Sequence, residues 1–208
     1  MSLPQSLRES ASPAELEFIA SQQLIEIIPL IAMERTVFIS GTYGPLQPPR
    51  RAKVPIWLAT NLKLKKKCRI IPPDWLTVGK FALLLSFFEN IYRRPVDHLR
   101  DCCEEETNNP KFSKLPFRFA EVAKVLLDVA PDDLEDADQL RLLLKNLREA
   151  RQAKTRDGLQ NLNPNELHVE NMCSMEINEI RPFFVQSMAI LGQLTRRPAA
   201  DADISAFD

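Results

Sequence analysis

The segment Val54 to Trp75, VPIWLATNLKLKKKCRIIPPDW, separates two parts of the chain that differ in character. It starts with apolar residues, continues with a lysine-rich run from Lys63 to Lys67, and ends shortly after the pair Pro72-Pro73. Proline fixes its own φ and pushes the residue before it toward an extended conformation, so a regular element that precedes Pro72 must end there. We therefore predict that this segment is the junction between two domains.

The composition is that of an ordinary globular chain. Its 208 residues are enough for one domain of average size or two small ones, and 45% of them are hydrophobic, which is enough to build a core. The formal net charge of -1 provides no overall field that would attract nucleic acid or a membrane. Electrostatic contacts are therefore expected only from local groups of charged residues.

Cysteine and histidine spacing gives no indication of a metal site. Cys68, Cys102, Cys103 and Cys173 include no C-x-x-C pair, and zinc is usually bound by closely spaced pairs of ligands. We expect reduced thiols in an intracellular protein, no metal and no cofactor. The first residues lack the apolar segment of a signal peptide, and no stretch is long enough to span a membrane.

The part before the junction has the pattern of a small β-rich domain, which we place at residues 12-70 after a flexible leader of residues 1-11. Ser12 to Glu15 has the S-x-x-E form of a capping box with proline at the first helical position, so a short helix is predicted to start there. Its expected apolar side includes Phe18. Residues 24-28 and 36-39 are short runs rich in β-branched and aromatic residues, which predicts strands of a mostly antiparallel sheet.

The part after the junction is predicted to be helical. Apolar residues recur at helical spacing from Phe119 to Val129, and again from Leu140 in a longer helix that runs to about Leu159. The segment from Met172 to Leu194 contains Pro182, which predicts a short helix, a break, and a second helix that starts at the proline. We place the helical domain at residues 71-194 and a disordered tail at residues 195-208.

Two groups of cationic side chains admit two interpretations. The candidates for electrostatic contacts are Lys63, Lys65, Lys66, Lys67, Arg148, Arg151 and Lys154. Such groups are typical of a solvated surface, and they can also contact acidic protein or nucleic acid. No aromatic residue stands between Trp57 and Trp75 for bases to stack on, which weakens the nucleic-acid interpretation without excluding it.

No motif of a known catalytic class is present in the chain. There is no G-x-S-x-G, no H-E-x-x-H and no Walker loop. The acidic residues from Asp132 to Asp138 fit the loop and first turn between two helices better than a metal site for phosphoryl transfer. We therefore expect no enzyme activity, and the residues alone indicate a two-part interaction protein.

The motifs around the junction resemble those of the second subunit of the eukaryotic GINS complex, the family called Partner of Sld Five two, in its fungal form. The similarity rests on the sequence from Glu17 to Trp75, which includes IEIIP, GPL, VPIWLATNLK and KCRIIPPDW. Shorter matches follow in order at residues 124-128, 136-141, 151-154 and 175-178. Together these motifs cover most of residues 14-194.

The resemblance implies an α+β fold that is predominantly α-helical, with a small N-terminal β-rich domain (B-type) followed by a C-terminal helical bundle (A-type). That domain order is the reverse of the order in two of the three sister subunits. The resemblance further implies a nuclear, non-catalytic subunit of a heterotetramer of the four GINS subunits. This tetramer joins the MCM ring and a further accessory protein as the replicative helicase, and it connects the helicase to the replicative polymerase.

In that family the helical domains pack on one another, so part of the apolar surface of the helices is expected to be buried by sister subunits. The candidates for packing between domains or subunits are Trp57, Leu58, Leu62, Trp75, Phe117, Phe119, Leu143, Leu147 and Phe184. The sequence leaves undecided whether this chain contacts DNA directly. The alternative interpretation is a free-standing nucleic-acid-binding protein with a basic patch.

Residues 79-96, GKFALLLSFFENIYRRPV, depart from the family pattern. Where the family continues from Trp75 into a charged helix, this chain resumes that pattern only at Asp97. The extra residues are either an intron wrongly retained in the gene model or a genuine insertion of one lineage, and the sequence of the transcript across this region distinguishes the two.

Overall fold

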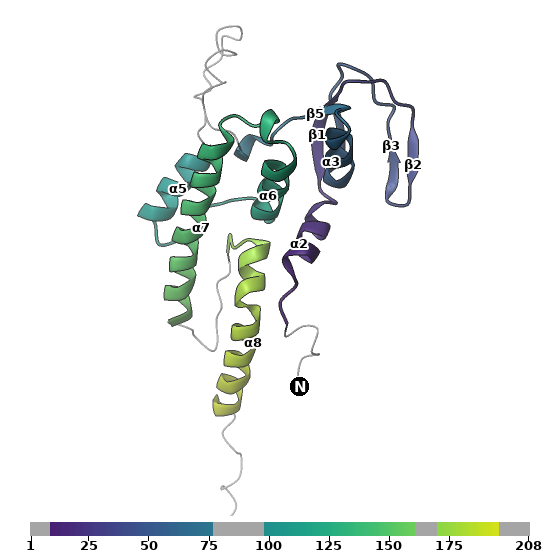
Figure 1. The fold of residues 1–208 in the computed structure, drawn as a ribbon. Coiled ribbons are helices and arrows are strands. Elements are labelled where there is room, and N and C mark those ends of the chain that lie inside the picture. Colours follow the sequence, from purple (N-terminus) through teal and green to yellow (C-terminus); the bar gives the residue numbers. More distant parts are fainter. Residues whose placement is uncertain (1–8, 77–97, 161–169, 196–208) are drawn as a thin grey trace, which may run out of the picture.

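The computed structural model describes residues 9-76, 98-160 and 170-195 (Figure 1). The N-terminal part comprises α2 (Pro13–Ala20), β1 (Leu24–Pro29), β2 (Thr36–Phe38), β3 (Gly41–Tyr43), β4 (Ala52–Pro55), α3 (Ile56–Leu64), β5 (Cys68–Ile70) and the 3-10 turn η1 (Asp74–Leu76). The C-terminal part comprises α5 (His98–Asn108), α6 (Phe119–Val129), the 3-10 turn η2 (Pro131–Asp133), α7 (Ala137–Gln160) and α8 (Ser174–Thr195). The predicted leader, the insertion at 79-96 and the predicted tail lie wholly or largely outside the described residues.

The N-terminal domain contains a three-stranded antiparallel sheet in the order β4-β1-β5 and a separate antiparallel hairpin, β2-β3. The prediction of a small antiparallel sheet is confirmed. Successive residues of a strand point to opposite faces, and in β1 the side chains of Ile25 and Ile27 are buried while Leu24 is exposed. Helix α3 follows β4 directly and packs against the sheet, so the apolar start of the junction segment is a helix inside this domain.

Helix α2 begins as the sequence predicts. The Ser12 side chain accepts a hydrogen bond from the Glu15 backbone N–H, and the Glu15 carboxylate accepts one from the Ser12 backbone N–H. This reciprocal pair satisfies two backbone donors that the first turn leaves free. The expectation for Phe18 is wrong, because its side chain is 70% exposed and only Ala20 of the helix is fully buried.

The C-terminal domain is a helical bundle in which α6 and α7 match the predicted helices. The expected break in α8 is wrong, because the helix is continuous from Ser174 to Thr195 with Pro182 inside it. Proline removes one backbone hydrogen bond, the one that residue 182 would donate to the carbonyl of Asn178, but the residues on both sides keep helical geometry. The later turns of α8 extend beyond the rest of the bundle (Figure 1).

The two domains share one hydrophobic core. Buried residues of the sheet and α3, such as Ile27 and Leu62, belong to the same cluster as Leu126 of α6 and Leu147 of α7. Helix α6 contacts both α2 and α3. The junction is therefore a packed interface rather than a loose connection. Among the described residues, no helix has the length and apolar character needed to cross a membrane.

Candidate functional site

The most constrained contact between the domains is made by Asp133 in η2. Its side chain is 5% exposed and lies at the edge of β5, where Oδ2 accepts a hydrogen bond from the backbone N–H of Ile70 at 2.8 Å and forms an ion pair with Lys63 Nζ at 2.7 Å. Arg69 Nε lies 3.7 Å from the other oxygen. One carboxylate of the helical domain therefore satisfies an edge N–H of the sheet and neutralises a lysine of α3.

Further polar contacts join the domains along α2. The Arg118 guanidinium donates to the carbonyl of Ile19 at 2.9 Å, and Lys124 of α6 forms an ion pair with Glu17. The side chain of Asn178 in α8 exchanges two hydrogen bonds with the backbone of Ala11. Because the contacts involve both α6 and α8, they fix α2 against the helical bundle.

Aromatic side chains pack within and across the domains. Trp75 in η1 meets the ring of Phe119 in α6 edge to face, with ring centroids 6.4 Å apart. Trp57 in α3 packs edge to face against Phe38 and Tyr43 of the hairpin, at 5.1 and 6.2 Å. Trp75 therefore packs η1 onto the helical bundle, whereas Trp57 attaches the hairpin to its own domain.

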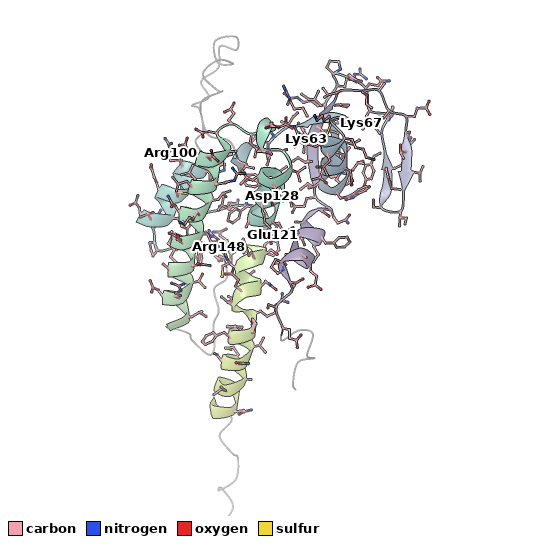
Figure 2. All side chains as sticks on the ribbon, viewed as in Figure 1. Lys63, Lys67, Arg100, Glu121, Asp128 and Arg148 are labelled. Atoms are coloured by element: carbon pink, nitrogen blue, oxygen red, sulfur yellow. The ribbon has the colours of Figure 1, made fainter. Side chains whose placement is uncertain are left out.

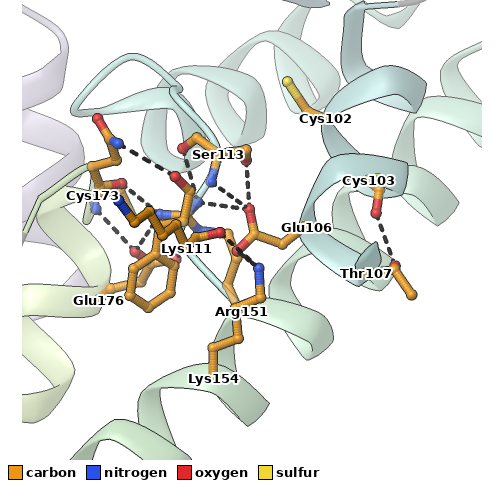
Figure 3. A network of polar contacts seen from close by, with 12 residues as sticks. Cys102, Cys103, Glu106, Thr107, Lys111, Ser113, Arg151, Lys154, Cys173 and Glu176 are labelled. Atoms are coloured by element: carbon orange, nitrogen blue, oxygen red, sulfur yellow. Dashed lines mark hydrogen bonds and ion pairs between the residues drawn. The ribbon is translucent and has the colours of Figure 1, made fainter. Parts of the chain in front are cut away.

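A second polar site lies inside the helical bundle around Arg151 of α7 (Figure 3). The Arg151 side chain is completely buried and forms two hydrogen bonds to the carboxylate of Glu176 in α8, at 2.5 and 2.9 Å. It also donates to Glu106 of α5 at 3.2 Å and to the carbonyls of Ser113 and Asn171. The guanidinium thus connects three helices at once.

The carboxylate of Glu106 is the second buried centre of this network. It accepts hydrogen bonds from the Ser113 hydroxyl and backbone N–H, at 2.5 and 2.9 Å, and from Lys154 Nζ at 2.9 Å. Burial alone would raise the pKa of Glu106, but the bonds from Ser113 and Lys154 and the charge of Arg151 lower it below its usual value. Burial would lower the pKa of Arg151, but the hydrogen bonds that it donates to Glu176, and the charges of Glu176 and Glu106, raise the pKa above its usual value.

The structure corrects several of the predicted electrostatic contacts. Arg151 is not available to an outside partner, because it is buried and fully bonded within the chain. Lys154 and Lys63 are also largely buried and paired, with Glu106 and Asp133 respectively. Arg148 is exposed and forms an ion pair with Glu179. These four cations stabilise the fold, since their carboxylate partners come from other parts of the same chain.

The remaining lysines of the predicted group stay at the surface. Lys65 and Lys66 are exposed in the turn between α3 and β5, and Lys67 is half-buried there. Lys63 and Lys67 lie at the same end of the N-terminal domain (Figure 2). Within the described part of the chain, Lys65, Lys66 and Lys67 form no ion pair.

The predicted packing residues divide into two groups. Leu58, Leu62, Phe119 and Leu147 are buried inside the chain, and Trp57, Trp75, Leu143 and Phe184 are half-buried. Phe117 is exposed over 53% of its surface. Whether a sister subunit covers the second group and Phe117 stays a prediction.

Sequence reasoning missed the acidic partners in both sites. Asp133 was assigned to a solvated loop, and Glu106 and Glu176 were not singled out at all. Their arginine and lysine partners are 25 to 70 residues away, so no local pattern points to them. The one available signal was the position of Arg151, four residues after the core residue Leu147 and so on the buried side of the helix. A charged side chain on that side needs a partner of opposite charge.

Glu121 of α6 is a buried carboxylate whose charge is poorly compensated (Figure 2). Neither side-chain oxygen makes a hydrogen bond of normal geometry within the described residues. Burial raises the pKa of Glu121, and its own backbone N–H, the nearby Ser174 hydroxyl and Arg118 offset only part of that rise. At neutral pH this residue therefore reduces stability rather than adding to it.

Replacing Glu121 by glutamine is expected to stabilise the protein at neutral pH by roughly 1 kcal/mol, because the variant buries no charge. A carboxyl whose folded pKa is raised contributes most favourably at low pH, and the contribution is lost as the pH rises through that pKa. The gain should therefore shrink below about pH 4, where Glu121 is protonated in both states. Thermal unfolding at several pH values measures this, with the exposed Glu104→Gln in α5 as the control. A variant less stable than the parent at neutral pH would contradict this assignment.

The buried cysteine thiols of the described residues are not activated as nucleophiles. Burial raises the pKa of Cys68 and Cys102 to about 11 and that of Cys173 to about 12, so these thiols are protonated at neutral pH. In the part of the chain that the structure describes, no group of three or more histidine, cysteine or acidic residues is arranged to hold a metal ion. The two polar sites connect domains and helices.

Two family models match the chain, and their boundaries follow the two domains. The model described as PSF2 N-terminal domain matches residues 12–71, and the one described as GINS complex protein helical bundle domain matches residues 96–195. The first covers the sheet with α2 and α3, and the second covers α5 to α8. With these two models matched in this order, the chain is a GINS-type protein.

Relatives with curated names specify the family further. The chain is 40% identical over 188 residues to DNA replication complex GINS protein psf2 of Schizosaccharomyces pombe, covering 90% of this chain and 93% of that protein. It is 38% identical over 195 residues to the Candida albicans PSF2 protein, covering 93% and 88%, and 35% identical over 178 residues to the human one, covering 84% and 87%. The chain belongs to the GINS PSF2 family.

Proposed function

We propose that this chain is a non-catalytic structural subunit of a GINS heterotetramer in the nucleus. In this proposal the tetramer joins the MCM ring and a further accessory protein as the replicative helicase, and it acts in initiation and elongation of chromosomal DNA replication. Contact with the replicative polymerase is indirect. Family membership supports the assembly, and the buried thiols and paired charges described above support a role without catalysis.

The observation that carries the proposal is the apolar surface left uncovered on the helical bundle. Phe183 and Ile190 of α8 are 52% and 58% exposed and stand seven residues apart, which places them on one side of the helix. Leu142 of α7 is 57% exposed, and Phe117 lies just before α6. Large apolar side chains on several elements of one domain are typical of a surface that another protein covers.

Charging the exposed side of α8 is expected to prevent assembly. Phe183→Asp with Ile190→Asp should reduce co-purification with the three sister subunits by roughly a hundredfold, because each aspartate would be buried without a partner in the interface. The measurement is size-exclusion chromatography of the four co-expressed subunits, with a tag on this chain. Circular dichroism of the variant should match that of the parent, since both positions are exposed in the isolated chain.

The matched control is Val37→Asp in β2, which introduces the same charge at an apolar residue that is 77% exposed in the other domain. It should leave the tetramer intact. Normal assembly of the α8 variant would show that this side of the helix is not the subunit contact. An unchanged parent chain that recruits no GINS subunit would refute the proposed function itself.

The alternative of a free-standing nucleic-acid-binding protein has less support. It relied on Arg148, Arg151 and Lys154 together with the lysine run, but Arg151 and Lys154 are bonded inside the bundle and Lys63 is bonded to Asp133. An affinity for nucleic acid that falls steeply with salt would restore this alternative.

A further inference from the structure

The chain concentrates positive charge in one segment of the N-terminal domain. Between Arg50 and Arg69 there are eight lysines and arginines and no acidic residue. Two carboxylates from elsewhere pair with four of these cations: Glu26 lies near Arg51 and Lys53, and Asp133 pairs with Lys63 and Arg69. Most of this charge is therefore left uncompensated, although the whole chain has a net charge of -1.

The strand register places much of this charge on one face of the sheet. Lys53 of β4 is opposite Glu26 of β1, and Arg69 of β5 is opposite Ile28 of β1. These four residues point away from the buried side, where Ile25 and Ile27 lie. Arg51 precedes Lys53 by two residues and Lys67 precedes Arg69 by two, so a cationic column flanks the central strand on each side.

The central strand provides apolar side chains between the two cationic columns. Leu24 at the start of β1 is 63% exposed, and Leu30, directly after its end, is 58% exposed. Ile28 lies half-buried between them. We call this surface, formed by Leu24, Ile28, Leu30, Arg51, Lys53, Lys67 and Arg69, the outer sheet face. Its centre is apolar except for Glu26, whose carboxylate lies near Arg51 and Lys53, and cations lie on both sides of it.

The edge of this sheet at β5 is closed to a further strand. The backbone N–H of Ile70 points away from β1 and donates to Asp133, so the helical domain occupies the position that an added strand would need. A ligand of the outer sheet face therefore cannot extend the sheet at β5, and we expect the side chains of the face to hold it.

We propose that the outer sheet face binds an acidic segment of a partner protein that carries large apolar side chains. Carboxylates of such a segment would lie against the two cationic columns, and its apolar residues would cover Leu24, Ile28 and Leu30. Nucleic acid fits this surface less well. A phosphate backbone gains nothing from exposed leucines, and the face has no aromatic side chain on which a base can stack. The inference does not depend on the proposed place in a GINS tetramer.

Fluorescence anisotropy tests the inference. The sample is the full-length chain, either alone or together with whatever subunits co-purify with it. The probes are three labelled molecules of similar length: a peptide of glutamates interspersed with leucines, a peptide of glutamate alone, and a DNA duplex. The leucine-containing peptide should bind tightest, and its affinity should fall with added salt. Lys53→Glu with Lys67→Glu, one change in each cationic column, should weaken it at least about tenfold.

Two further variants separate the contributions. Leu24→Ser with Leu30→Ser should weaken the leucine-containing peptide and leave the pure glutamate peptide unchanged. The control, Lys145→Glu with Arg156→Glu, changes two exposed cations of α7 and should have no effect. The inference is wrong if no acidic peptide binds, if the α7 control weakens binding equally, or if the DNA duplex binds tighter than either peptide and ignores the leucine changes.

Discussion

Arg151→Ala is expected to lower the free energy of unfolding by about 3 to 5 kcal/mol, the largest effect of any change proposed for this chain. Removing Arg151 eliminates its attraction to the two glutamates and also leaves buried negative charge without its cation. Glu176 is nearly buried and loses both of its bonds from the guanidinium, and the completely buried Glu106 loses one of its two cationic partners while keeping Ser113 and Lys154. The carbonyl of Asn171, which accepts from Arg151 at 2.7 Å, also loses its bond.

The chain offers a matched control on the same pair of helices. Arg148 of α7 pairs with Glu179 of α8 at 2.7 Å, but the arginine side chain is 55% exposed. Because water replaces such a pair at little cost, Arg148→Ala should lower the free energy of unfolding by less than about 1 kcal/mol. Urea unfolding of both variants measures the difference. Equal losses would mean that the buried network contributes no more than an exposed ion pair.

The pH dependence of Arg151→Ala provides an independent readout. In the parent the pKa of Glu106 is lowered, so its contribution is present above about pH 4.5 and is lost as the pH falls through the folded pKa. In the variant Glu106 and Glu176 lack the charge of Arg151, so they take up protons more readily, and protonation removes part of the cost of burying them. The two curves should therefore converge in acid. A constant difference across the pH range would point to lost packing as the cause.

The elements of this fold could largely be predicted from sequence because their signals are local. The capping box at Ser12 is contained in four residues, and the apolar stripe of α7 repeats along a single helix. Pro182 shows where local signals mislead. The rule that proline breaks a helix reflects the loss of one backbone hydrogen bond. In α8 that loss is tolerated, because the residues on both sides of Pro182 remain helical through Thr195.

The polar sites could not be predicted because each depends on residues that only the folded chain brings together. Arg151 and Lys154 have the spacing of a solvated helical face, and what distinguishes them is Glu106, 45 and 48 residues earlier in the sequence. Asp133 is next to the exposed Asp132, and nothing in the residues around them indicates which one turns toward the sheet. The family resemblance identified the domains without identifying these contacts.

Asp133→Ala is expected to lower the free energy of unfolding by roughly 3 kcal/mol, because it leaves both the Ile70 N–H and the ammonium group of Lys63 without their acceptor. For a chain of this length the loss corresponds to a decrease in Tm of about 6 to 12 °C. Since the carboxylate belongs to the helical domain and both donors belong to the sheet domain, the variant should also loosen the interface. Hydrogen exchange at Ile70 should become faster than in the parent.

Asp132→Ala is the matched control, because it removes the same group one residue earlier, where the side chain is exposed. It should change Tm by no more than about 2 °C. A small effect for both variants would mean that the domains are held by apolar packing, such as that of α6 against α2 and α3, with Asp133 serving only to close the sheet edge. A large effect of Asp133→Ala alone, with faster exchange at Ile70, would establish Asp133 as the residue that couples the two domains.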